Sequence, residues 1–174
     1  MVEVETPTGR IAYGPVAPSD VASLFQAGFT HGGLHALRLG EPGQIPFLAN
    51  QERLLFSRCG VAGPLDLAAY EKGGGLTGLR TALKRSPSDV VSEIKASGLR
   101  GRGGAGFPTG RKWETVANTP ADRRFICCNA DEGDSGTFAD RMLIEGDPFS
   151  LIEGMSIAAF AVGAEHGFVY IRSE

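Results

Sequence analysis

Residues 125–136 read F-I-C-C-N-A-D-E-G-D-S-G, so an apolar run passes directly into an acidic segment that contains glycine. The run Phe125–Cys128 is typical of a short buried strand. Further along, Asp147-Pro148 predicts the start of a helix over residues 149–162. Aspartate favours the N-cap of a helix, and proline favours its first position.

A second strand is predicted at residues 167–172 (G-F-V-Y-I-R), after Gly163 ends the helix. Strand, long crossover and strand form a βαβ unit, whose strands are parallel and whose connection is right-handed. The fold class is therefore predicted to be α/β. Ligands of such sheets bind just beyond the carboxyl ends of the strands, and the segment 129–136 lies there.

This acidic segment places the carboxylates of Asp131, Glu132 and Asp134 close together in sequence, which leaves three interpretations open. A solvated turn is the ordinary one. A calcium site would use the same oxygen atoms but lacks the final bidentate acid of an EF-hand loop. In the third, the carboxylates and the Asn129 amide hydrogen-bond the hydroxyl and ring N–H groups of a cofactor whose phosphate is held elsewhere.

A second segment, residues 98–113, reads G-L-R-G-R-G-G-A-G-F-P-T-G-R-K-W. Glycine permits positive φ angles and lets a ligand approach the main-chain N–H groups, which form anion-binding nests. Four basic side chains add local positive charge: Arg100, Arg102, Arg111 and Lys112. The segment is therefore predicted to bind an anionic cofactor such as a flavin or dinucleotide, with a flexible basic loop as the alternative.

The glycines at 101, 103 and 106 satisfy the dinucleotide pattern G-x-G-x-x-G, which ordinarily follows a strand. Here a helix precedes the pattern. Ser86 is suited to its N-cap, Pro87 to its first position and Asp89 to a capping box, while Val90 and Val91 supply an apolar face. An ordinary Rossmann dinucleotide site is therefore not expected.

The N-terminal third of the chain is less informative. Residues 1–15 predict a β-hairpin and residues 18–27 a small helix. The glycine- and proline-rich segment 28–46 is predicted to be a linker, in which His31 and His35 are surface residues rather than metal ligands. Helices are also predicted over residues 65–72 and 76–83, separated by three glycines, and Cys59 is predicted to be a buried apolar residue.

Composition restricts the classes of partner. A net charge of −3 argues against a nucleic-acid surface. The apolar run 151–164 contains Glu153 and is shorter than the roughly 20 residues that span a membrane, and the acidic N-terminus does not resemble a signal peptide. Three cysteines without C-x-x-C spacing offer neither a disulfide framework nor cluster ligands. A cytoplasmic protein without membrane insertion and without a metal site is expected.

The two motifs together, residues 98–113 followed by C-N-A-D-E-G-D-S-G-T-F-A-D-R at 128–141, resemble the NADH-binding FMN and iron–sulfur flavoprotein subunit of complex I (51 kDa type). The same module occurs in NAD-reducing hydrogenases and in NAD-dependent formate dehydrogenases. N-A-D-E-G-D-S-G-T-F, with Y-I-R-S-E at the end, looks closest to the beta subunit of soluble molybdenum or tungsten formate dehydrogenases. This resemblance covers about residues 45–174.

The resemblance implies a partial Rossmann-like FMN-binding domain with parallel strands, in which residues 47–174 are the N-terminal part of the FMN/NADH-binding domain. Residues 1–27 resemble the tail of a thioredoxin-like [2Fe–2S] domain, joined by the linker 28–46. The chain is expected to be a fragment, with an open strand edge and an exposed apolar face. The [4Fe–4S] and [2Fe–2S] clusters are expected only in the full-length subunit.

The implied activity is hydride transfer between NAD(H) and FMN, with electrons relayed through iron–sulfur clusters. In a formate dehydrogenase the electrons flow from formate to NAD⁺, and the implied partners are the molybdenum or tungsten alpha subunit and a small [2Fe–2S] subunit. A complex I or hydrogenase flavin subunit is the alternative within the family. A non-catalytic scaffold is the alternative of another class. The chain alone is expected to bind FMN weakly and to turn over little or not at all.

The resemblance also assigns site residues. FMN is held by Gly101, Arg102, Gly103 and, near the phosphate, Lys112, while Gly106 completes the loop. The ribityl chain and isoalloxazine contact Asn129, Asp131 and Glu132. On the nucleotide side, Gly104 and Ala105 line the nicotinamide, Phe107 stacks on adenine, and Asp134 contacts the ribose where many relatives have glutamate. No residue is expected to act as a general acid or base, because the cofactor supplies the chemistry.

Overall fold

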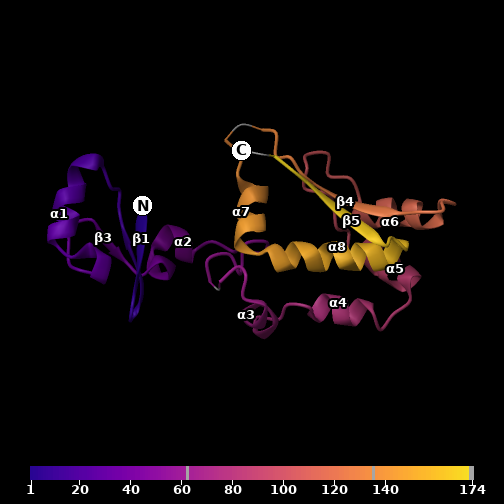
Figure 1. Cartoon of the computed structure of the whole chain (residues 1–174), viewed down its shortest axis with the longest axis horizontal. Coiled ribbons are helices and arrows are strands. Elements are labelled where there is room, and N and C mark those ends of the chain that lie inside the picture. Colours follow the sequence, from indigo (N-terminus) through magenta and orange to yellow (C-terminus); the bar gives the residue numbers. More distant parts are fainter. Residues whose placement is uncertain (62, 135, 173–174) are drawn as a thin grey trace. The chain divides into compact units, whose positions relative to one another are not determined.

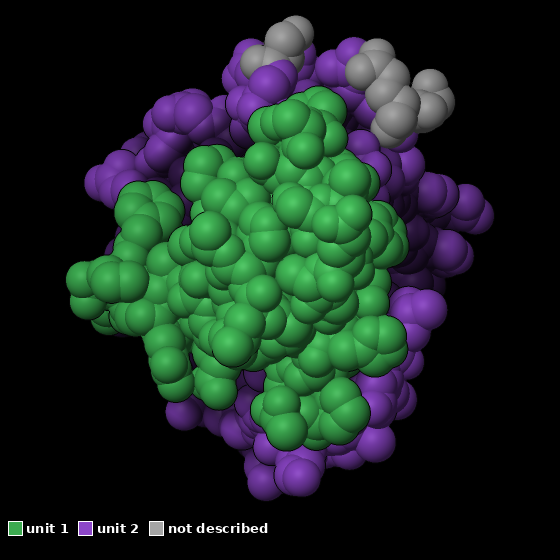
Figure 2. All heavy atoms as spheres, turned by 90° about the vertical axis from the view of Figure 1, so that its left-hand side faces the viewer, with its two compact units in different colours: residues 1–53 green, residues 54–174 purple. Residues whose placement is uncertain are grey.

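The computed structural model describes all residues except 62, 135 and 173–174. Contacts divide the chain into two compact units, residues 1–53 and 54–174, which are coloured separately in Figure 2. Each unit has its own small apolar core, so each is described by itself.

The N-terminal unit is built on an antiparallel sheet in the order β1, β2, β3 (Val2–Thr6, Gly9–Tyr13 and Arg38–Gly40). The predicted hairpin is confirmed: β1 and β2 pair throughout, and Gly9 adopts a φ of +121° at the turn. The segment predicted to be a linker contains β3, which pairs with β2. Periodicity could not indicate so short a strand, because three residues hold only one alternation.

Short helices complete this unit: η1, α1, η2, η3 and α2 (Pro18–Asp20, Val21–Gln26, Phe29–His31, Pro42–Gln44 and Pro46–Ala49). The first two confirm the helix predicted over residues 18–27. Tyr13 is fully buried beside Leu24, with its ring edge-on to Phe29 at 5.8 Å between centroids. Its hydroxyl donates a hydrogen bond of 2.6 Å to the Gly33 carbonyl, so the buried polar atom is satisfied.

The C-terminal unit begins with the helices α3, α4, α5 and α6 (Leu67–Lys72, Thr77–Ala82, Pro87–Ala96 and Thr109–Asn118). The first three were predicted. The hydroxyl of Ser86 accepts the Asp89 amide, and Val90 and Val91 are buried, as the capping pattern indicated. Helix α6 was not predicted, because its N-cap is Pro108, which offers no side-chain acceptor.

The sheet of this unit pairs β4 (Phe125–Ala130) with β5 (His166–Ile171) in parallel, which confirms the α/β class. Between them run α7 (Ala139–Gly146) and α8 (Pro148–Val162). Helix α8 contacts both strands and also α4, α5 and α6, so it lies at the centre of the unit (Figure 1). Gly163, at a φ of +71°, ends α8 as predicted.

Only one face of β4 is covered and every residue of β5 is exposed, so the prediction of a buried β4 is wrong in part. Ala130 is buried, whereas Phe125 is 49% exposed and Cys127 is also exposed. The rings of Phe125 and Phe168 lie 5.9 Å apart on the uncovered face, which confirms the expected exposed apolar surface. Cys128 is half-buried, and burial raises the pKa of its thiol.

Two further predictions concerned Asp147 and Cys59. Asp147 precedes α8 but its side chain does not cap the helix; it is buried and pairs with Arg58 at 2.9 Å. Arg58 and Asp147 lie 89 residues apart in the sequence, so no local sequence pattern could indicate this ion pair. Cys59 is half-buried rather than buried, and lies so close to Gly146 that a Cβ at that glycine would come within 2.9 Å of the cysteine sulfur.

Candidate functional site

The glycine-rich loop between α5 and α6 is closed by its own hydrogen bonds. The Thr109 amide donates to the Leu99 carbonyl at 2.9 Å, and the Gly101 amide donates to the Phe107 carbonyl at 2.9 Å. The Arg100 guanidinium donates to the Gly106 carbonyl at 3.0 Å. The two limbs therefore pair like a short hairpin, and residues 102–106 form its tip.

The tip of this loop needs glycine for conformational reasons. Gly104 has a φ of +101° and Gly106 a φ of +60°, both in the left-handed region that side chains disfavour. The neighbouring Phe107 is 51% exposed, so its ring is accessible to a stacking partner. The loop therefore combines left-handed glycines with an exposed aromatic ring.

The positive charge of this loop is not neutralised by acidic neighbours. Within the part of the chain that the structure describes, Arg102, Arg111 and Lys112 form no ion pair. The nearby lysine of α5, Lys95, pairs instead with Glu114 at 2.6 Å. Uncompensated cations beside a helix N-terminus favour an anionic ligand.

Helix α6 is held close to α5 at a glycine. A Cβ at Gly110 would lie 2.4 Å from the backbone nitrogen of Lys95, so a larger residue does not fit. Trp113, on the same helix, packs against the core cluster that includes Val91 and Ala161. This packing fixes the first turn of α6, which carries Lys112.

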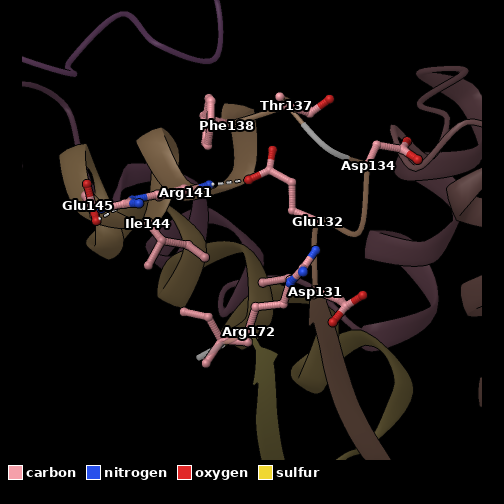
Figure 3. Close-up of a pocket in the computed structure, with 12 residues that line it drawn as sticks. Asp131, Glu132, Asp134, Thr137, Phe138, Arg141, Ile144, Glu145 and Arg172 are labelled. Atoms are coloured by element: carbon pink, nitrogen blue, oxygen red, sulfur yellow. Dashed lines mark hydrogen bonds and ion pairs between the residues drawn. The ribbon is translucent and has the colours of Figure 1, made fainter. Parts of the chain in front are cut away.

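The acidic loop (residues 129–134) begins at the carboxyl end of β4, where the βαβ rule places a ligand site. The Asn129 side-chain oxygen accepts the Asp131 amide at 3.2 Å, which turns the chain away from the strand. Glu132 follows with a φ of +47°, and its carboxylate accepts the amides of Asp140 at 2.8 Å and Arg141 at 3.1 Å. Figure 3 shows this contact with α7.

A cavity of about 350 Å³ opens beside this loop, a volume at the lower end for small-molecule sites. Its walls come from the acidic loop, the residues before α7, α7 itself and the end of β5 (Figure 3). They combine carboxylates, two arginines and apolar side chains: Ala130, Asp131, Glu132, Asp134, Gly136, Thr137, Phe138, Arg141, Ile144, Glu145, Ile171 and Arg172. Such a lining suits a ligand with a planar apolar part and polar substituents.

The predicted site residues fall into two groups. Asp131, Glu132 and Asp134 line this cavity. Asn129 shapes the loop but does not line the cavity, and neither does Lys112 nor any residue of 101–107. The glycine-rich loop and the acidic loop are thus two separate candidate surfaces.

Sequence reasoning missed the walls supplied by α7 and by Arg172. Helix α7 has no capping side chain at its own N-cap, Phe138, so the usual start signal is absent. Arg172 could have been found, because it is the last residue of the second predicted strand (167–172), at the carboxyl edge where ligands bind. The strand was predicted, but Arg172 was not included among the predicted site residues.

Two classes of site have no support in the described residues. Outside positions 62, 135 and 173–174, no group of three histidine, cysteine or acidic side chains is arranged to hold a metal ion. His31 is exposed and hydrogen-bonds Thr30 at 3.0 Å, whereas His35 contacts Ser23 at 3.1 Å. Among the described residues, no helix is both long enough and apolar enough to cross a membrane.

Comparison with known proteins gives these surfaces a family context. Residues 94–174, which include both loops, match the family model of the Nuo51 FMN-binding domain. The F 2 subunit of the NADH-quinone oxidoreductase of Rhizobium meliloti (strain 1021) is 53% identical over 109 residues, which are 62% of this chain and 26% of that protein. The NADP-reducing hydrogenase subunit HndC of Solidesulfovibrio fructosivorans is 48% identical over 124 residues, 71% of this chain and 25% of that protein.

A solved structure agrees with this relationship. The crystal structure of an NAD⁺-reducing [NiFe]-hydrogenase in the air-oxidized state superposes with a TM-score of 0.55 at 28% identity, covering 92% of this chain and 26% of that chain. The present chain thus spans about a quarter of the length of the relatives it matches. Residues 94–174 are therefore similar to the FMN-binding domain of complex I 51 kDa and hydrogenase flavoprotein subunits.

Proposed function

We propose that this chain is the FMN-binding part of an NAD(H):FMN oxidoreductase module of the complex I or NAD-reducing hydrogenase type. The observation that carries the proposal is the presence of two chemically complementary loops within residues 94–174. One presents uncompensated cations at the start of α6, and the other presents carboxylates at the carboxyl end of β4. One loop is suited to phosphate and the other to hydroxyl and ring N–H groups.

The chemistry of the side chains fits FMN. Lys112, with Arg102 beside the loop backbone, would hold the phosphate by charge-assisted hydrogen bonds. Asp131 would accept hydrogen bonds from ribityl hydroxyls, and the exposed ring of Phe107 would stack on the adenine of NAD(H). Asp134 would accept a bond from the nucleotide ribose.

Bound FMN would supply the hydride and one-electron chemistry, and the protein would supply position and field. The described residues then have three tasks: to fix the phosphate, to orient the ring and to align the nucleotide over it. Gly104 and Ala105 would leave room for the nicotinamide, since neither carries a large side chain. No general acid or base is required of this chain.

The identity of the whole complex is a finer proposal. Assignment to an NAD-dependent formate dehydrogenase, with a molybdenum or tungsten alpha subunit and a small [2Fe–2S] subunit as partners, rests on the sequence resemblance. The complex I and hydrogenase relatives support the alternative better. Assays of the native complex for NAD⁺ reduction by formate, NAD⁺ reduction by hydrogen and NADH-dependent quinone reduction would separate the three.

Titration of FMN with the purified chain, followed by quenching of flavin fluorescence, tests the proposal. Wild-type protein should quench with weak affinity, and Lys112→Ala should weaken binding by about tenfold, the value of one charge-assisted contact. Lys84→Ala is a matched control, because Lys84 is an exposed lysine in the turn after α4.

A catalytically silent scaffold makes the opposite prediction for this titration. It would not quench flavin fluorescence, and Lys112→Ala would behave like Lys84→Ala. Either result would remove FMN binding as the function of the chain. NADH–ferricyanide reductase activity equal to that of a full-length subunit would instead contradict the expectation that this chain alone turns over little.

A further inference from the structure

The start of α7 presents backbone donors that its own N-cap does not satisfy. The first N–H groups of any helix have no partner within the helix. At the N-cap of α7 stands Phe138, whose side chain cannot accept a hydrogen bond. At such an exposed helix start the acceptor comes from solvent or from elsewhere in the chain.

Glu132 supplies that acceptor from the acidic loop. One carboxylate oxygen accepts the Asp140 amide at 2.8 Å, and the other accepts the Arg141 amide at 3.1 Å. A negative charge at this end of the helix is also favoured by the helix dipole. The Glu132 carboxylate thus caps the N-terminus of α7 although Glu132 lies outside the helix.

The backbone of Glu132 is consistent with this use. Its φ of +47° lies in the left-handed region, which a residue with a long side chain adopts only where its surroundings hold it there. In Figure 3 the Glu132 side chain points toward α7, whereas the carboxylates of Asp131 and Asp134 lie on the other side of the loop. The contact with α7 accounts for both the backbone conformation and the direction of the side chains.

We propose that Glu132 is a positioning residue, which clamps the acidic loop to the N-terminus of α7 and thereby directs Asp131 and Asp134 toward the ligand. The identity of that ligand as FMN with NAD(H) rests on the proposed function. In this role Glu132 acts through the backbone of α7.

The test compares Glu132→Asn, Glu132→Gln and the double variant Glu132→Asn with Phe138→Asn. Asparagine tolerates the left-handed region but is too short to reach α7. Glutamine keeps one acceptor oxygen. The double variant restores a capping side chain at the helix itself. Glu145→Gln is the control for amide exchange, because it breaks the exposed pair of Arg141 with Glu145 on the same helix.

The first readout is hydrogen exchange at the amides of Asp140 and Arg141 in the protein without FMN. Glu132→Asn should accelerate exchange about tenfold or more, since a bond to a carboxylate is lost. Glu132→Gln should give a smaller increase, and the double variant should restore protection. Unchanged exchange in Glu132→Asn would overturn the clamp whatever the flavin titration gives.

The second readout is FMN fluorescence quenching by the same proteins. Binding should weaken about tenfold in Glu132→Asn and recover in the double variant, because the loop is repositioned without the carboxylate. Phe138→Asn alone is the control for binding, because Phe138 lines the cavity. Recovery of amide protection without recovery of binding to the level of that control would overturn the proposal and make Glu132 a direct ligand contact. Absence of FMN binding by wild-type protein would contradict the proposed function, while the exchange data would still decide the clamp.

Discussion

Replacing Glu153 by glutamine should destabilise the C-terminal unit more than any other conservative change on α8. Its carboxylate accepts the hydroxyl of Tyr70 and the amides of Leu76 and Leu79, the latter two at 2.7 and 2.9 Å. These bonds fix the segment that contains α3 and α4 to the central helix. Glutamine keeps one oxygen, but its NH₂ group would face donors on the other side.

The magnitude follows from two bonds lost at one oxygen. A hydrogen bond to a charged group contributes about 1.5–3 kcal/mol, which gives roughly 3–6 kcal/mol for Tyr70 and Leu76 together. Glu153 is half-buried, so water replaces part of this, and we expect a loss of about 2–4 kcal/mol. With a urea m value of about 2 kcal/mol/M, the unfolding midpoint should fall by roughly 1–2 M.

Urea unfolding followed by tryptophan fluorescence measures this change, because the single tryptophan, Trp113, packs against the core of the same unit. Glu145→Gln is the control: its carboxylate lies in an exposed i,i+4 pair and should cost less than about 0.5 kcal/mol. A midpoint for Glu153→Gln within about 0.2 M of that control would refute the reasoning.

The same substitution should change the acid side of the stability curve. Burial acts to raise the pKa of Glu153, but the hydrogen bonds from Tyr70, Leu79 and Leu76 outweigh it and lower the pKa below 4.5. A carboxyl with a lowered folded pKa stabilises the protein above its unfolded pKa, and this stability is lost as pH falls through the folded pKa. Wild-type protein should therefore lose stability below about pH 4.5 more steeply than Glu153→Gln.

Three further outcomes are expected. Burial, and then the bond to Glu153, raise the pKa of Tyr70 to about 12, so wild-type stability should fall as pH rises from 10 through 12, and Tyr70→Phe should flatten that fall in alkaline unfolding curves. Gly110→Ala should cost about 1–3 kcal/mol in urea unfolding because its Cβ meets the Lys95 backbone, and equal stability would contradict the close approach. Tyr13→Phe should lower the stability of the N-terminal unit by about 1 kcal/mol in a thermal melt, through loss of the bond to Gly33.

Local signals explain which parts of the fold could be predicted. The cap at Ser86, the end of α8 at Gly163 and the alternation of apolar and turn residues around β4 all act within a few residues, and sequence patterns record them. The parallel pairing followed from connection rules rather than from any single residue. A helix or strand could therefore be predicted from the sequence wherever the residues that begin and end it lie within or next to it.

Predictions failed where a helix end is capped, or a capping residue is engaged, by a side chain that lies beyond the few residues of a capping motif. Helix α7 has no capping residue of its own because Glu132 caps it, and Asp147 does not cap α8 because Arg58 takes its carboxylate. The burial of β4 also depends on how many helices cover the sheet, and here α8 covers one face only. For the candidate site, residue types were predictable, whereas the wall formed by α7 required the folded chain.

The two candidate surfaces differ in how they are held, and this has a consequence for ligand binding. The glycine-rich loop closes through its own bonds, from Gly101 to Phe107 and from Arg100 to Gly106, so its shape depends little on the rest of the unit. Among the residues that the structure describes, the hydrogen bonds from the acidic loop to α7 come from Glu132. A preorganised loop loses little conformational entropy when a ligand binds. The acidic loop would lose more if its hydrogen bonds to α7 were weakened. Under the proposed function, changes in α7 should therefore alter the orientation of the ligand ring and nucleotide more than the binding of the phosphate.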